Sequence, residues 1–177
     1  MEKGRVTNAL RGIRRFAKFE RILAAACILS PASLIVFGDG PIRDSISAYY
    51  NMEKGQFYYF PLTVTAMLFI VNGVVKQQHV YNTILGGALA GAVLFNHSDA
   101  KLIHGAFASI FFVGNAVVIV LFSSKKERWF KIFLVVGIGL SMIGCFFFKW
   151  FTLFWAEWLS FSIIALHYIL ESWGVID

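Results

Sequence analysis

The sequence has few charged residues and only two cysteines. Charged side chains make up 15% of its 177 residues, whereas a soluble globular domain carries about 25%. Cys27 and Cys145 both lie inside apolar runs, where a free thiol behaves as a small hydrophobe. They imply neither a disulfide framework nor a zinc motif of the CxxC type. Motifs of the HExxH and GxSxG types, which mark zinc proteases and serine hydrolases, are also missing.

Apolar residues are abundant instead, at 58% of the chain. At roughly 20 apolar residues per span, the chain has room for about six membrane spans and for no separate soluble domain. We therefore predict an all-α polytopic membrane protein, a bundle of six transmembrane helices. The third span is short and rich in small residues (GGALAGA), so we expect it to be the most buried. The predicted spans are Ile22–Gly38, Phe57–Val75, Thr83–Phe95, Leu102–Phe122, Trp129–Phe148 and Phe151–Trp173.

Basic residues are distributed unevenly between the two sides of the membrane that these spans define. Of the 16 lysines and arginines, all but four fall on the side of the two termini. The exceptions are Arg43, Lys54, Lys101 and Lys149. The positive-inside rule places both termini in the cytoplasm, and a bacterial inner membrane is the expected location. The net charge of +6 is explained by this topology, so no nucleic-acid partner is inferred from it.

Residues 1–21 form a basic segment before the predicted transmembrane domain of residues 22–177. Its apolar residues recur at helical spacing, and its basic residues fall largely on the remaining surface. This pattern predicts a short amphipathic helix on the cytoplasmic leaflet. A plain basic tail that fixes the topology is the alternative.

Polar side chains gather on the external side, in the loop Ile42–Gln56, in the third-to-fourth turn and at the starts of the fourth and sixth spans. Tyrosines at such boundaries are commonly interface anchors. The alternative reading is that the loop folds over the bundle and lines a lipid headgroup pocket. The predicted lipid- or ligand-binding residues are Ser45, Ser47, Tyr49, Tyr50, Asn96, His97, Asp99, His104 and Glu157.

The sixth span carries ionisable residues on one face of its helix. Glu157, His167 and Glu171 fall at helical spacing, and intramembrane ionisable residues normally face the bundle interior. Glu157 lies at a depth that His104 can match, so we predict a hydrogen bond between them that pins two helices. His167 and Glu171, at i and i+4, form an inner polar stripe and could pair with each other.

Three kinds of chemistry are compatible with these residue types. Zinc could be held by His97, Asp99, His104 and Glu157, although no spacing is diagnostic and no metal site is assigned. A serine hydrolase would use Ser45 or Ser47 as nucleophile and His104 or His97 as base. Asp44, Asp99 or Glu157 would orient the base. A proton or ion pathway along Glu157, His167, Glu171 and Asn115 is a further alternative. No catalytic residue is assigned, and no cofactor is expected.

Four short motifs resemble a known superfamily. They are IRDSISAYY after the first span, GALAGAVLFN in the third, IHGAFASIFFVGN opening the fourth, and AEW early in the sixth. This layout is similar to that of the FRAG, DRAM and SFK proteins. That superfamily has six spans and includes damage-regulated autophagy modulators, a factor in GPI-anchor lipid remodelling and small bacterial membrane proteins.

The resemblance implies a membrane protein that handles or senses lipids, or that regulates a membrane enzyme. It marks Ser45, Ser47, Asn96, His104, Glu157 and Trp158 as the matching positions. The superfamily often has an acidic residue directly after the histidine, whereas Gly105 stands here. That departure weakens the transfer of a His-Asp catalytic unit.

The leading functional hypothesis is a non-enzymatic protein that binds or senses lipid, or regulates a membrane partner, through its external polar mouth. A membrane-embedded lipid hydrolase or remodelling enzyme with the same residues is the first alternative. A structural subunit of a larger membrane complex is the second. Membrane lipids are the expected partners, and a membrane-protein partner or a second copy of the chain stays open.

Overall fold

The protein is all-helical. The computed structural model describes the chain except for Met1, Asp39, residues 53–55 and 76–79, Asn96, Asp99, residues 123–126 and Asp177, and except for the side chains of residues 2–16, Gln56, Phe57 and Phe122. The described residues contain no β-strand, which confirms the all-α part of the predicted fold class. The elements are α1 (Glu2–Phe37), η1 (Ile46–Asn51, a 3-10 helix), α2 (Gln56–Val75), α3 (Val80–Leu94), α4 (Lys101–Val117), η2 (Val118–Phe122, a π-helical turn), α5 (Arg128–Phe146) and α6 (Leu153–Ser172).

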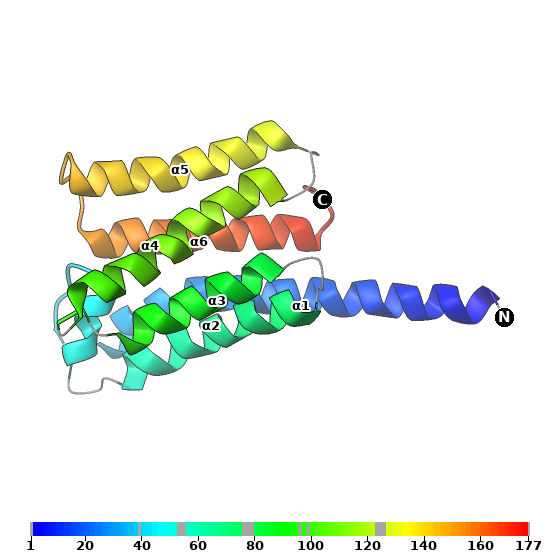
Figure 1. Cartoon of the computed structure of the whole chain (residues 1–177), viewed down its shortest axis with the longest axis horizontal. Coiled ribbons are helices and arrows are strands. Elements are labelled where there is room, and N and C mark those ends of the chain that lie inside the picture. The colour runs from blue at the N-terminus through cyan, green and yellow to red at the C-terminus, as the bar shows by residue number, and fades with distance from the viewer. Residues whose placement is uncertain are drawn as a thin grey trace.

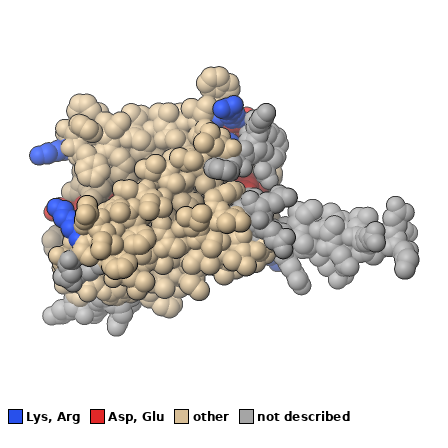
Figure 2. Space-filling model, viewed as in Figure 1, with Lys and Arg blue, Asp and Glu red and all other residues tan. Residues whose placement is uncertain are grey.

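The helices lie side by side as one bundle (Figure 1). Helix α1 packs against α2 and α6, α3 packs against α2 and α4, and α5 packs against α6. Both chain ends lie at one end of the bundle, and η1 lies at the other, which we call the η1 end (Figure 1). On the face shown in Figure 2, Lys, Arg, Asp and Glu side chains gather at the two ends and leave the surface between them uncharged.

Five helical segments among the described residues are long and apolar enough to cross a membrane. They are Ala17–Phe37, Tyr58–Val75, Lys101–Leu121, Arg128–Phe146 and Leu153–Ser172. Helix α3 has 15 residues and is therefore roughly 22 Å long at about 1.5 Å per residue. A bilayer's hydrocarbon core is about 30 Å thick, so α3 falls short of that thickness.

Helix α3 can lie between its neighbours because small residues let backbones approach. A Cβ added at Gly86 would come 2.6 Å from the carbonyl oxygen of Ala66 and 2.8 Å from the amide nitrogen of Ile70, both on α2. At Gly91 a Cβ would come 2.7 Å from the ring of Phe107 on α4. Gly86 and Gly91 thus set close contacts on two sides of α3.

Buried amide and hydroxyl side chains join three helices near the end away from η1. Asn82 on α3 donates to the side-chain oxygen of Asn72 on α2 at 2.8 Å, and the Tyr168 hydroxyl on α6 donates to Asn82 at 3.0 Å. All three side chains are buried. Polar pairs of this kind hold helices together in an apolar surrounding, at about 0.6–2 kcal/mol each.

The N-terminal segment differs from expectation. A separate short helix was predicted over residues 1–21, but α1 runs unbroken from Glu2 to Phe37. Basic residues ended the predicted span because charge lowers hydropathy, but lysine and arginine are good helix formers and do not end a helix. The side chains before Ala17 lie outside the described part of the chain, so the amphipathic assignment stays a prediction.

Candidate functional site

The 3-10 helix η1 is fixed to α6 at the η1 end. Ser45 caps its start, with the side-chain oxygen accepting the backbone N–H of Ala48 at 3.1 Å, which is the usual role of serine at a helix start. The backbone N–H of Ile46 donates to the Glu157 carboxylate of α6 at 2.8 Å. The N–H of Phe154, at the start of α6, donates to the carbonyl of Asp44 at 2.7 Å. These bonds hold η1 in place over the bundle.

His104 satisfies carbonyl groups at the end of α3. Its Nδ1 lies 2.8 Å from the carbonyl oxygen of Ala92 and 3.0 Å from that of Phe95. The last carbonyls of a helix have no partner within the helix, and a carbonyl can only accept. The contacts therefore assign the hydrogen to Nδ1, and in the neutral ring Nε2 keeps a free lone pair.

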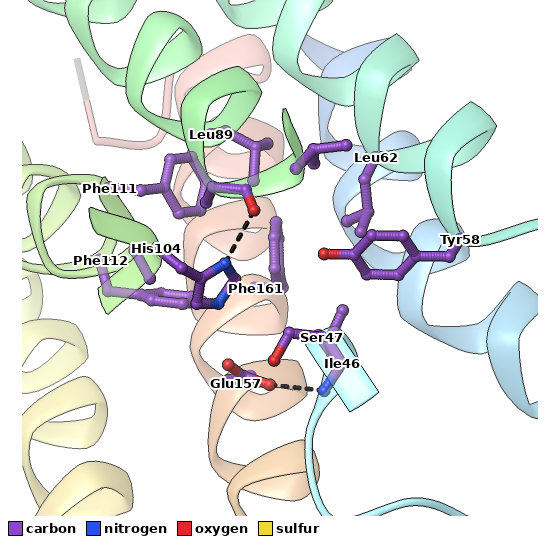
Figure 3. Close-up of a pocket in the computed structure, with 13 residues that line it drawn as sticks. Ile46, Ser47, Tyr58, Leu62, Leu89, His104, Phe111, Phe112, Glu157 and Phe161 are labelled. Carbon is purple, nitrogen blue, oxygen red and sulfur yellow. Dashed lines mark hydrogen bonds between the residues drawn. The ribbon is translucent and has the colours of Figure 1, made fainter. Parts of the chain in front are cut away.

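Glu157 and His104 line the same cavity, between the helices and beneath η1 (Figure 3). Its volume is about 30 Å³, more than the roughly 10–15 Å³ that one water molecule needs. Ser47 contributes its hydroxyl to the lining, and the hydroxyl of Tyr58 also points inward (Figure 3). The lining residues are Ile46, Ser47, Tyr58, Leu62, Leu89, Ala92, Val93, His104, Ala108, Phe111, Phe112, Glu157 and Phe161.

The predicted hydrogen bond between His104 and Glu157 is wrong. Between these two described side chains the structure has no direct hydrogen bond, although both are 93% buried, with 7% of their surface exposed. Each instead bonds to backbone, the histidine to α3 carbonyls and the carboxylate to the amide of Ile46. Both side chains thus avoid the cost of an unpaired buried polar group without meeting each other.

Of the predicted binding residues, Ser47, His104 and Glu157 meet at the cavity, whereas Ser45 and the tyrosines of the loop lie outside its lining. The hydroxyl of Ser45 lies 3.0 Å from that of Ser47, and the two form a hydrogen bond. Tyr49 is buried, and its ring packs 5.7 Å from that of Phe154. Tyr49 therefore helps to dock η1.

Two further aromatic positions are also outside the cavity lining. The ring of Tyr50 packs edge-on against those of Tyr58 and Tyr59, at 6.2 and 5.4 Å. Trp158, marked by the family resemblance, stacks on Trp155 at 5.3 Å. Its buried Nε1 has no hydrogen-bond partner among the described residues. These side chains pack around the site without lining it.

His97 stands beside the site. It is exposed, and its ring meets that of His104 edge-on, with 5.4 Å between centroids. Partial burial lowers the pKa of His97 below its ordinary value of 6.5, and repulsion from His104 and Lys101 lowers it further. Asn96 and Asp99, also predicted here, lie outside the described residues.

The zinc hypothesis has no assembled site in the part of the chain that the structure describes. No three His, Cys, Asp or Glu side chains come together there as metal ligands, and a zinc site needs three or four. Asp99, one of the four ligands considered, lies outside the described residues.

The inner polar stripe lies at the end of α6 away from η1. His167 is buried, and its Nε2 lies 3.9 Å from the Glu171 carboxylate. The i, i+4 spacing predicted this approach. The outer and inner ionisable groups of α6 thus lie in separate places and do not form one site.

Several cavity residues were missed by the sequence analysis. Helical spacing could have found some of them, because Ala108 and Phe111 follow His104 by one and two turns, and Phe161 follows Glu157 by one. Tyr58 was not considered, because tyrosines at the start of a predicted span are commonly interface anchors. The amide of Ile46 gives no sequence signal, because every residue except proline has one.

These observations define the class of the protein: a bundle of apolar helices, most of them of membrane-spanning length, with a small polar cavity near one end. The chain belongs to a family of unknown function, DUF7103, whose family model matches residues 29–172. Every residue that lines the cavity falls inside the matched region. No curated protein and no solved structure matches the chain.

Proposed function

We propose that this protein is a six-span integral membrane protein that binds the polar group of a membrane lipid in the cavity beneath η1. The observation that carries the proposal is the cavity itself. Four hydrogen-bonding side chains, Ser47, Tyr58, His104 and Glu157, come to it from η1, α2, α4 and α6 inside a largely apolar bundle. Ionisable groups at such depth are costly and are retained mainly where they act.

The topology is part of the proposal. Both chain ends lie at one end of the bundle (Figure 1), which requires an even number of crossings and hence a crossing by the short α3. The positive-inside rule then assigns both termini to the cytoplasm and η1 to the other side. The bacterial inner membrane is the proposed location. The resemblance to the FRAG, DRAM and SFK superfamily supports a lipid-related role.

A lipid hydrolase is the second candidate, because a serine, a histidine and a carboxylate line one cavity. The orientation of His104 favours it: two carbonyls hold Nδ1, so the free Nε2 could act as a general base. The Ser47 hydroxyl, however, has its hydrogen bond with Ser45 at 3.0 Å and none with His104. We therefore place binding before catalysis.

The first test is native mass spectrometry of gently purified protein, with Glu157→Gln and the control Glu171→Gln on the same helix. We expect a lipid adduct on the wild type and on Glu171→Gln, and its loss from Glu157→Gln. An adduct retained by Glu157→Gln argues against the cavity as the binding site. If the wild type carries no lipid, or is seen only with other subunits, the result favours the alternative that the protein is a structural subunit of a larger membrane complex.

A turnover assay distinguishes a lipid hydrolase from a protein that only binds lipid. Reconstituted wild type, His104→Ala and the neighbouring control His97→Ala are incubated with mixed phospholipids, and the products are analysed by mass spectrometry. A hydrolase releases fatty acid or headgroup in the wild type and in His97→Ala, but not in folded, monodisperse His104→Ala. Unchanged lipid in all three samples excludes the hydrolase for the lipids tested.

A further inference from the structure

The polar atoms of the cavity mostly accept hydrogen bonds. One oxygen of Glu157 accepts from Ile46, while the other has no hydrogen-bond partner among the described residues. The second ring nitrogen of His104 lies on the side of the ring that faces Glu157 and Ser47 (Figure 3). The hydroxyls of Ser47 and Tyr58 can donate or accept. A ligand that supplies donors fits this set best.

The charge of the cavity is negative or neutral. Its lining contains Glu157 and no lysine or arginine. Phosphate groups are recognised by arginine, lysine or a cluster of backbone N–H groups, and here the backbone N–H of Ile46 is already taken by Glu157. An anionic headgroup would be repelled by the carboxylate in a low-dielectric surrounding. The cavity therefore disfavours a phosphate and favours a cation.

The size of the cavity narrows the choice among cations. A volume of about 30 Å³ accepts a group close to a water molecule in size, such as a primary ammonium. A trimethylammonium group is several times larger and has no N–H to donate. Its recognition uses faces of aromatic rings arranged as a cage, whereas this cavity presents a carboxylate and an imidazole lone pair.

We propose that the cavity binds the primary ammonium group of an aminophospholipid, with Glu157 and the Nε2 of His104 as acceptors. The inference rests on the lipid-binding function proposed above and specifies the headgroup. The phosphate of the same lipid stays outside the cavity. Lys101, exposed one helical turn before His104, is the basic side chain nearest in sequence that can meet it.

The test compares three lipids with identical short acyl chains: phosphatidylethanolamine, its N-trimethylated analogue phosphatidylcholine, and phosphatidic acid. Each is titrated against detergent-purified, delipidated protein, and binding is followed by native mass spectrometry and by the shift in Tm. We expect phosphatidylethanolamine to bind about tenfold more tightly or better than the other two, since a hydrogen bond to a charged group is worth about that much. The preference should fall to about one in Glu157→Gln and persist in Glu171→Gln.

Three other results overturn the inference, each in a different way. If all three lipids bind equally and Glu157→Gln weakens each, the cavity binds lipid without reading the amine, and only the headgroup assignment fails. If the ethanolamine preference survives in Glu157→Gln, the amine is recognised elsewhere. If no lipid binds the wild type at any concentration below micelle formation, the proposed function itself fails.

Discussion

The carboxylate of Glu157 has two structural roles, which different substitutions can separate. It fixes the backbone of Ile46, and through that bond it holds η1 over the cavity. It also presents a second oxygen to the cavity. A change that keeps the hydrogen bond but removes the charge, such as Glu157→Gln, tests the second role. A change that removes the acceptor tests the first.

We predict that Glu157→Ala loosens η1 while leaving the bundle folded. The substitution leaves the buried amide of Ile46 without an acceptor, which costs about 1–3 kcal/mol, and the 3-10 helix is short enough to open locally. Hydrogen–deuterium exchange of a peptide covering Ile46–Asn51 should become about tenfold faster or more. Exchange in α2 and α5 should change little.

Glu171→Ala is the control for this experiment, because it removes a carboxylate from the same helix at the end away from η1. Equal exchange of the η1 peptide in wild type and Glu157→Ala would mean that the bond between Glu157 and Ile46 does not hold η1.

For single residues, the sequence predicted polar side chains that line the cavity better than it predicted their hydrogen-bond partners. Ser47, His104 and Glu157 were found because ionisable and hydroxyl groups stand out against apolar helices. Their partners were not found, because carbonyls of Ala92 and Phe95 and the amide of Ile46 belong to the backbone. The side-chain pattern therefore suggested a hydrogen bond between His104 and Glu157, whereas each of these side chains bonds separately to the backbone.

Helix α3 has two adjacent glycines with different surroundings. Gly86 faces α2 at a distance that leaves no room for a methyl group, whereas the neighbouring Gly87 has nothing within 4 Å of the position where a Cβ would lie. The same chemical change at adjacent positions should therefore have opposite effects.

We predict that Gly86→Ala destabilises the protein by about 1–3 kcal/mol, the usual cost of overpacking a tight interface. Gly87→Ala should be neutral or should stabilise the helix by about 0.5–1 kcal/mol, because alanine loses less backbone entropy than glycine. Thermal unfolding of both variants in one detergent measures the difference. If both alanines lower Tm equally, helix propensity cannot be the cause, and α3 packs differently from this structure.

Hydropathy located the six α-helices but missed η1, which was predicted as a loop, and misplaced some helix ends for identifiable reasons. The third span was predicted from Thr83, while α3 begins at Val80, because Asn82 appears polar in the sequence. In the structure Asn82 is buried and bonded to Asn72 and Tyr168. A partner hidden in another helix makes a polar residue compatible with the interior, and no single-helix pattern contains that partner.

At the scale of the whole molecule, the membrane topology of the two ends of the bundle can be tested. We predict that the η1 end and the chain termini lie on opposite sides. Single cysteines placed at Asn51 and at Trp173, both exposed, should report this in a background where Cys27 and Cys145 are replaced by alanine. A membrane-impermeant maleimide should label Asn51→Cys in intact cells, and Trp173→Cys only after permeabilisation.

This measurement also tests whether α3 crosses the membrane. If α3 crosses, the number of crossings is even, and both termini should lie on the same side of the membrane. A tag at the N-terminus and Trp173→Cys on opposite sides would mean an odd number of crossings, and α3 would then be a helix packed inside the bundle that does not pass through it.

The bond between Ile46 and Glu157 joins residues 111 positions apart, and this separation sets an order of assembly during synthesis. At about 5–20 residues per second, the ribosome needs on the order of ten seconds after making η1 before Glu157 exists. Helix α1 likewise waits for α6, against which it packs. In the nascent chain, η1 is therefore undocked and the surface of α1 that packs against α6 is uncovered. Both contacts form only after α6 has been synthesised.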